Sequence, residues 1–137
     1  MTFESALLAR LVGDEELSAA TGGRIDFGRT FAGLPAISLQ IVSDPRPQHF
    51  KGFHSTRATD VQVDIWAKTV ETGAPLREQV IALLVANAES EGVQFQRAMI
   101  TNVRAGAEQQ QSGPVPVQRV RAELHRTSID ITFTHDA

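Results

Sequence analysis

Two stretches near the middle of the chain alternate apolar with polar side chains, and this alternation limits most strongly what the sequence can fold into. The first covers residues 35–43 (PAISLQIVS) and the second covers residues 61–67 (VQVDIWA). Such alternation is typical of a β-strand that buries one face. We therefore predict two strands, each with a wetter opposite face. Trp66 falls on that opposite face, which leaves it at a sheet edge, under a helix or at a subunit interface.

The clearest helical pattern follows the second strand. We predict a main helix over residues 75–90, with Pro75 in its first turn, where the missing N–H is harmless. Gly92 is expected to end it. The apolar stripe of this helix, at helical spacing, consists of Leu76, Val80, Leu83 and Leu84.

Two short helices and a short strand are predicted before residue 35. Thr2 can cap the first helix and Gly13 stops it. Asp14 is expected to cap the second helix, which ends at Gly22-Gly23 and leads into a strand over residues 24–27. The apolar residues that mark the first helix are Phe3, Leu7, Leu8 and Leu11.

The last third of the chain predicts a long antiparallel hairpin. Its arms cover residues 93–103 and 117–133, joined by a polar loop at 105–116 that we expect to be mobile in an isolated subunit. Along the second arm the apolar residues change from even to odd positions, which strict alternation would place on opposite faces. We therefore expect a bulge or bend around residues 125–128, or a strand that changes partner there.

These patterns predict an α+β fold: a mostly antiparallel sheet with a main helix packed on one face, short N-terminal helices and a long C-terminal β-hairpin. The 137 residues suffice for one domain, spanning residues 1–137, with a real core. No apolar run approaches the roughly 18 residues that a membrane span needs. The N-terminus lacks the basic segment of a signal peptide, so we expect a cytoplasmic protein.

The side chains that could carry chemistry form no recognisable catalytic or metal-binding pattern. The chain has no cysteine. Asp60, Asp64 and Asp130 fall on predicted strands, where acid–base work would require two facing carboxylates and a raised pKa. We expect no enzyme activity, no metal and no cofactor. The histidines, whose spacing fits no metal motif, are His49, His54, His125 and His135.

A basic segment makes nucleic-acid binding an alternative. Arg46, Lys51 and Arg57 lie between the two central strands with no acid among them, beside Phe50 and Phe53. Such interleaved aromatic rings can stack on bases. The net charge of −3 argues against this function, and we favour a surface or interface role.

Two long loops and an open hairpin edge favour self-association. Loops at 44–58 and 105–116 reach about a dozen residues or more, a length that is usually functional or disordered. The hairpin edge must be covered or paired, and a neighbouring copy of the chain could do both. The candidate interface residues are Arg46, His49, Phe50, Phe53, Arg57, Trp66, Glu108 and Gln110.

The order of strand, loop, strand and helix, with LPAI opening one strand and VQVDIWA forming the next, resembles the tail-completion (tail-terminator) proteins of long-tailed bacteriophages and of phage-derived gene transfer agents. The resemblance covers most of the chain, including the short N-terminal helices. It implies a structural virion-assembly protein that forms a hexameric ring. That ring would cap the head-proximal end of the tail tube, end tube growth and provide the head–tail joining surface.

The resemblance also implies partners: other copies of the chain, the tail tube protein and the head–tail connector or stopper. DNA would meet the protein only by passage through the ring lumen, which the strands would line. The protein would reside in the host cytoplasm during assembly and then in the virion or gene-transfer-agent tail. Alternatives are a head-completion or tube component of the same machine, or a small nucleic-acid- or ligand-binding α+β domain.

Overall fold

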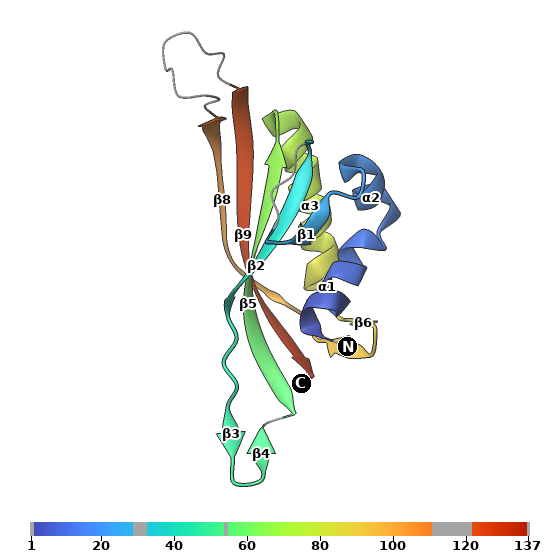
Figure 1. The fold of residues 1–137 in the computed structure, drawn as a ribbon, viewed down its shortest axis with the longest axis vertical. Helices are drawn as coiled ribbons and strands as arrows, with labels where there is room; N and C mark the ends of the chain where they lie inside the picture. Colours follow the sequence, from blue (N-terminus) through green and yellow to red (C-terminus); the bar gives the residue numbers. More distant parts are fainter. Residues whose placement is uncertain (1, 29–32, 54, 111–121, 137) are drawn as a thin grey trace.

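The computed structural model describes residues 2–28, 33–53, 55–110 and 122–136, and Figure 1 shows how their elements are arranged. The helices are α1 (Phe3–Val12), α2 (Glu15–Thr21) and α3 (Val70–Val85). The strands are β1 (Ile25–Phe27), β2 (Ala36–Ser43), β3 (Gln48–His49), β4 (Gly52–Phe53), β5 (Thr56–Ala67), β6 (Ala88–Ser90), β7 (Val93–Phe95), β8 (Met99–Gln110) and β9 (Ala122–Asp136).

Strand β9 lies at the centre of a seven-stranded sheet with the order β1-β2-β5-β9-β7-β6, and β8 also pairs with β9. The whole of β5 pairs antiparallel with β9, and β2 pairs antiparallel with β5. Strand β1 pairs with β2 in parallel. The prediction of a mostly antiparallel sheet is therefore confirmed, as are the two central strands.

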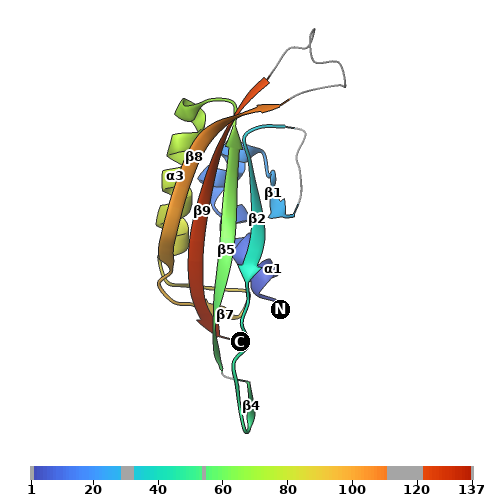
Figure 2. The same cartoon turned by 90° about the vertical axis from the view of Figure 1, so that its left-hand side faces the viewer.

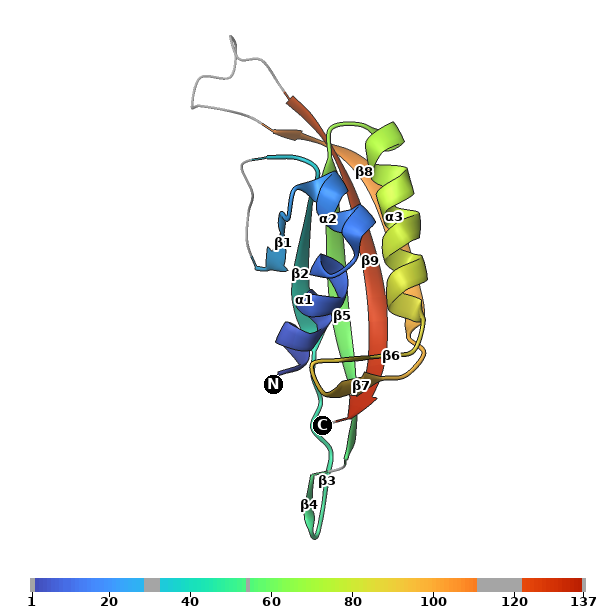
Figure 3. The same cartoon turned by 90° about the vertical axis from the view of Figure 1, so that its right-hand side faces the viewer.

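All three helices cover one face of the sheet (Figure 3), and no described element covers the opposite face, which is turned to the viewer in Figure 2. The core lies between sheet and helices, where α3 buries Leu76, Val80 and Leu84. The predicted stripe is thus confirmed, with Leu83 partly buried against the same core. The core residues from the two long strands are Val61, Val63, Ile65, Ile129, Ile131 and Phe133.

The N-terminal helices begin and end where their caps predict. Thr2 Oγ1 accepts a hydrogen bond from the Ser5 amide at 3.1 Å, and Asp14 Oδ1 accepts one from the Leu17 amide at 3.0 Å. Gly22 ends α2 in the left-handed conformation with φ of 63°, which glycine adopts without the cost of a Cβ. These signals are local, so the sequence contains them in full.

The start of α3 differs from the prediction. Thr69 caps the helix by accepting from the Thr72 amide, so Gly73 lies inside the helix and Pro75 lies in its second turn. A Cβ on Gly73 would stand 3.3 Å from His125 Nδ1 and 3.5 Å from the Ala67 Cβ. Glycine is therefore present because the helix lies close on the sheet, and it does not mark a helix boundary.

The predicted end of the main helix is also wrong. The helix ends at Val85, and the residues that follow form β6 and β7. Ser90 pairs with Val93, and the two residues between them have positive φ, 47° for Glu91 and 81° for Gly92. Two successive positive φ values match the twist of a tight two-residue hairpin. Gly92 thus serves a strand turn and is not a helix cap.

The predicted loop at 44–58 contains structure of its own. Strands β3 and β4 form a small two-stranded hairpin that projects beyond the end of the main sheet (Figure 1). Strand β5 already begins at Thr56. Since short two-stranded ribbons are marginal when isolated, this hairpin depends on its attachment to β2 and β5.

The C-terminal hairpin forms, but its predicted bulge lies elsewhere. The register of β9 with both β5 and β8 is continuous through residues 125–128, and the irregularity falls in β8 between Ile100 and Asn102. The other predicted possibility, a change of partner, is met in part: residues 122–124 of β9 pair with β8 alone, and from His125 onward β9 also pairs with β5, which ends at Ala67. The apolar residues change parity there because the hairpin leaves the core. The prediction of a loop at 105–116 is wrong as far as Gln110, because β8 continues to that residue. Residues 111–121 lie outside the described ranges.

Arg10 joins the helices to one another. It is 8% exposed, and its NH2 group donates to Leu83 O at 2.7 Å and to Ala86 O at 2.9 Å. These carbonyls lie at the C-terminal end of α3, where helix carbonyls lack intrahelical donors. The guanidinium carbon also lies 4.9 Å from the centre of the Phe95 ring. Arg10 therefore caps α3 from α1.

Arg10→Met should lower the free energy of unfolding by about 1–3 kcal/mol, because two partly buried carbonyls lose a charged donor while the apolar volume is largely kept. Urea unfolding followed by circular dichroism measures this. Arg77→Met is the control, since Arg77 pairs with the exposed Glu78 on the surface. An unchanged or higher stability of Arg10→Met would mean that desolvation of the guanidinium outweighs its two hydrogen bonds.

Candidate assembly surfaces

The face of the sheet opposite the helices, called here the outer face, carries a network of polar side chains. Asp64 lies at its centre and is only 6% exposed. Its carboxylate accepts from Gln62 Nε2 at 3.1 Å, from Ser128 Oγ, and from Arg126 Nε and NH2 at 3.3 Å each. The carboxylate of Asp64 is therefore satisfied by groups on β5 and β9.

Trp66 extends this network toward β2. Its indole N–H donates to Ser38 Oγ at 3.3 Å, and the Arg126 guanidinium lies 4.9 Å from its ring centre. Strand β5 has neighbours on both sides, and Trp66 points to the same face as Asp64. Of its three predicted positions, the sheet edge and the underside of a helix are thus wrong. The subunit interface stays a prediction.

The other aspartates of the outer face are also bonded. Asp130 accepts from Arg104 NH1 at 2.6 Å, and Asp60 accepts from Thr132 Oγ1 at 2.6 Å. The carboxylates that could have done acid–base work are therefore held by neighbouring donors. The outer face is polar, but its charges are largely compensated within the subunit.

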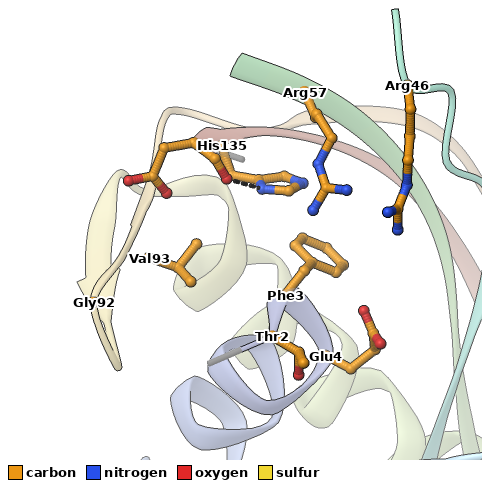
Figure 4. Close-up of a pocket in the computed structure, with 9 residues that line it drawn as sticks. Thr2, Phe3, Glu4, Arg46, Arg57, Gly92, Val93 and His135 are labelled. Carbon is orange, nitrogen blue, oxygen red and sulfur yellow. Dashed lines mark hydrogen bonds between the residues drawn. The ribbon is translucent and has the colours of Figure 1, made fainter. Parts of the chain in front are cut away.

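A second cluster lies at the end of the sheet nearest the chain termini. Arg46 donates to Asp44 at 2.8 Å, while Arg57 NH1 lies 4.0 Å from the same carboxylate. Thr59 Oγ1 is 3.4 Å from Asp44 and 2.8 Å from His135 Nε2. The cluster borders a pocket of about 320 Å³ between the start of α1, β5 and the end of β9. Figure 4 shows Arg46, Arg57 and His135 around the Phe3 ring.

The contacts of His135 define its proton arrangement. Its Nδ1 lies 2.7 Å from Asp136 O, and because a carbonyl only accepts, Nδ1 carries the proton. Neutral Nε2 then accepts from Thr59. The imidazole is 1% exposed and stacks on Phe3 with ring centres 4.4 Å apart. Burial lowers the pKa of His135 below its ordinary value.

Stability should therefore fall as the pH drops below about 6.5, the ordinary histidine pKa. Between the lowered pKa of folded His135 and that of the unfolded chain, the unfolded state binds more protons, so acid favours unfolding. Urea unfolding at about pH 7.5 and about pH 5.5 measures the difference. His135→Gln should lose part of this pH dependence. The same slope in both proteins would contradict the assignment.

The structure brings two of the predicted interface residues together and separates others. Arg46 and Arg57 border one pocket. Trp66 lies nine residues from Arg57 along β5, about 30 Å at strand spacing. Phe50 lies at the tip of the β3–β4 hairpin and is 111% exposed. His49 and Phe53 belong to that hairpin, and Glu108 and Gln110 to the far end of β8, by backbone pairing alone.

Sequence reasoning missed the bonds across the outer face and the His135 contacts. The available signal was the run of polar residues at even positions in both central strands. It shows a wet face but not which donors meet which acceptors. His54 lies outside the described residues. Within the part of the chain that the structure describes, no three histidine, aspartate or glutamate side chains gather as metal ligands, and no helix is long and apolar enough to cross a membrane.

Comparison with known proteins decides the family. The model of the family "Tail completion protein gp17" matches residues 5–125. The chain belongs to this family. Its role is structural, in tail assembly, and it acts together with other tail or particle proteins. The predicted tail-completion resemblance is thus confirmed.

The fold recurs in a solved particle. A chain of the structure "Virion of native gene transfer agent (GTA) particle" is similar with a TM-score of 0.69 and 14% sequence identity. The match covers 98% of this chain and 95% of that chain. At this identity the likeness shows the fold alone. No curated protein sequence matches the chain.

Phe50→Ser tests whether the tip of the β3–β4 hairpin is an assembly contact: it should shift any self-association to higher protein concentration and leave the isolated subunit intact. The Phe50 side chain is fully exposed, so its loss should change the unfolding free energy by no more than about 0.5 kcal/mol. Sedimentation velocity over a concentration series measures assembly, and thermal unfolding of the dilute protein measures stability. Marked destabilisation of the dilute subunit would instead place the Phe50 ring in its core.

Proposed function

We propose that this chain is a ring-forming tail terminator. Six copies join head to tail, cap the head-proximal end of the tail tube, end tube growth and offer a joining surface to the head connector. The family supports the place in the tail. The single observation that supports a ring is the long edge that β8 offers to another chain.

Strand β8 has twelve residues and, among the described strands, pairs only with β9. Met99 is 65% exposed, and residues 101–106 are all exposed, with Val103 at 39%. Unpaired N–H and C=O groups along such an edge are a template for another strand. At the other side of the sheet, β1 pairs with β2 only from Ile37 to Leu39. Two different edges on opposite sides suit head-to-tail contacts, which close into a ring if the rotation permits.

The outer face supports an orientation for this ring. With the helices outward, the outer face would line the lumen. There DNA would meet three carboxylates, of Asp60, Asp64 and Asp130, against two guanidinium groups, of Arg104 and Arg126. Internal pairing leaves few donors for phosphate, so DNA would pass without stable binding.

The β3–β4 hairpin projects from one end of the sheet and presents Phe50 and Lys51 at its tip (Figure 1). In the ring it would reach the tail tube protein or the connector. Residues 1–137 would act as a single domain. The protein would assemble in the host cytoplasm and remain in the tail of a virion or gene transfer agent, which the similarity to a chain of such a particle supports.

The mass of the purified protein, measured by light scattering after size exclusion across a concentration series, tests the ring. A hexamer, or a subunit that converts to a hexamer with concentration or with tube protein, is expected. A strict monomer that never assembles, even with tube protein, would contradict the ring and favour a head-completion or ligand-binding role.

The double variant Met99→Lys/Val103→Lys should raise the concentration needed for assembly, because charges on an edge strand oppose pairing with another strand. Both side chains are exposed, so the unfolding free energy of the dilute subunit should change by less than about 1 kcal/mol. Val12→Lys/Val70→Lys adds the same charge to exposed helix positions, 44% and 52% exposed, and serves as the control. Equal assembly of both variants would exclude β8 as the joining edge.

A further inference from the structure

The pocket at the start of α1 holds Arg57, whose buried Nε donates no hydrogen bond to the residues that the structure describes. The Arg57 side chain is 17% exposed, and among the described residues its ion pair is the long one of 4.0 Å to Asp44. Its Nε is buried and has no hydrogen-bond partner among the described residues. A buried donor without an acceptor is costly and uncommon. This arrangement leaves Arg57 able to bind an acceptor from outside the described residues.

The pocket has the size and lining for a single acidic group. Its volume of about 320 Å³ is at the lower end of ligand sites, which suits one side chain or a chain end. Arg46 and Arg57 point their guanidinium groups into it (Figure 4). Phe3 and Val93 form the apolar part of the lining. Arginine is the residue that best binds a carboxylate with two parallel hydrogen bonds.

Two of the acidic groups near the pocket are already hydrogen-bonded, and Arg57 is the cation best placed to attract an anion. Asp44 is bonded to Arg46, and the Asp136 carboxylate accepts from the Gln94 amide at 2.9 Å. Glu4 lies on the pocket wall and opposes a second carboxylate. The imidazole of His135 is neutral in the arrangement derived above and adds no charge. The site therefore suits one carboxylate placed at Arg57, away from Glu4.

We propose that this pocket receives a carboxylate from a second copy of this chain in the assembled ring. The proposal rests on the proposed function for the source of the carboxylate, although not for the binding site itself. The chain carries 16 acidic against 13 basic residues, so a neighbouring copy offers many acidic side chains. Each contact between two copies would supply one carboxylate to one Arg57. The hydrogen bonding of Arg57 would therefore be completed only on assembly.

The test uses glutarate as the probe of the pocket and Arg57→Gln as the variant. At a concentration where light scattering gives the subunit mass, glutarate should raise the Tm of the unmodified protein more than sodium chloride of equal ionic strength does. Arg57→Gln should lose that rise. Arg77→Gln, which removes a surface guanidinium already bonded to Glu78, should keep it. Failure of glutarate to stabilise the unmodified protein would overturn the site whether or not a ring forms.

The assembly of the two variants tests whether a second copy of the chain supplies the carboxylate. Arg57→Gln should require about tenfold more protein for assembly, the loss expected for one charged hydrogen-bonded pair, while Arg77→Gln should assemble normally. Glutarate that stabilises the subunit, combined with normal assembly of Arg57→Gln, would overturn the second copy as the source. Glutarate that stabilises a protein that never self-associates would also overturn that source, and it would refute the ring separately. A large fall in the Tm of dilute Arg57→Gln would show that Arg57 serves the fold itself.

Discussion

The uninterrupted pairing of β5 with β9 is the constraint on which most of this structure depends. It runs from Thr56 opposite Asp136 to Ala67 opposite His125 without a bulge. Because side chains alternate along a strand, this one register sends the odd positions of both strands into the core and the even positions to the outer face. A slip of one residue would turn Asp64 toward the apolar core and Val63 toward the polar outer face. The core and the polar outer face are therefore two results of a single ladder.

The sequence contains the local part of this fold. Alternation in residues 35–43 and 61–67 predicts strands, and caps at Thr2 and Asp14 predict helix starts, because each signal lies within a few residues of the element it controls. The ends of α3 could not be predicted in this way. A Cβ on Gly73 would press on His125, more than fifty residues away, and Gly92 serves a turn between strands that the local sequence pattern does not reveal. A glycine indicates a constraint, and only the tertiary structure tells which one.

The candidate surfaces also differ in whether local sequence or long-range pairing creates them. Phe50 and the basic residues around it stand out in the sequence, because an aromatic ring in a polar loop lacks a core to enter. The pocket does not stand out, since Arg57 and Thr59 meet His135 only when the ends of β5 and β9 pair. The same holds for Asp64 with Arg126 and Ser128, which lie 62 and 64 residues apart in the chain. Long-range pairing assembles these sites from residues that look unremarkable one at a time.

The candidate surfaces differ in how far their groups already have partners within the described subunit. Polar groups on the outer face already bond to one another, so covering that face with protein would exchange good hydrogen bonds for others of similar strength. The β8 edge, the exposed Phe50 ring and the buried Nε of Arg57 differ, because each has an interaction that the described subunit does not complete. A strand edge gains backbone hydrogen bonds, an exposed ring gains apolar burial and an arginine gains a charged acceptor. Assembly energy should therefore come mainly from the β8 edge and from the end of the sheet that carries Phe50 and Arg57, more than from the outer face.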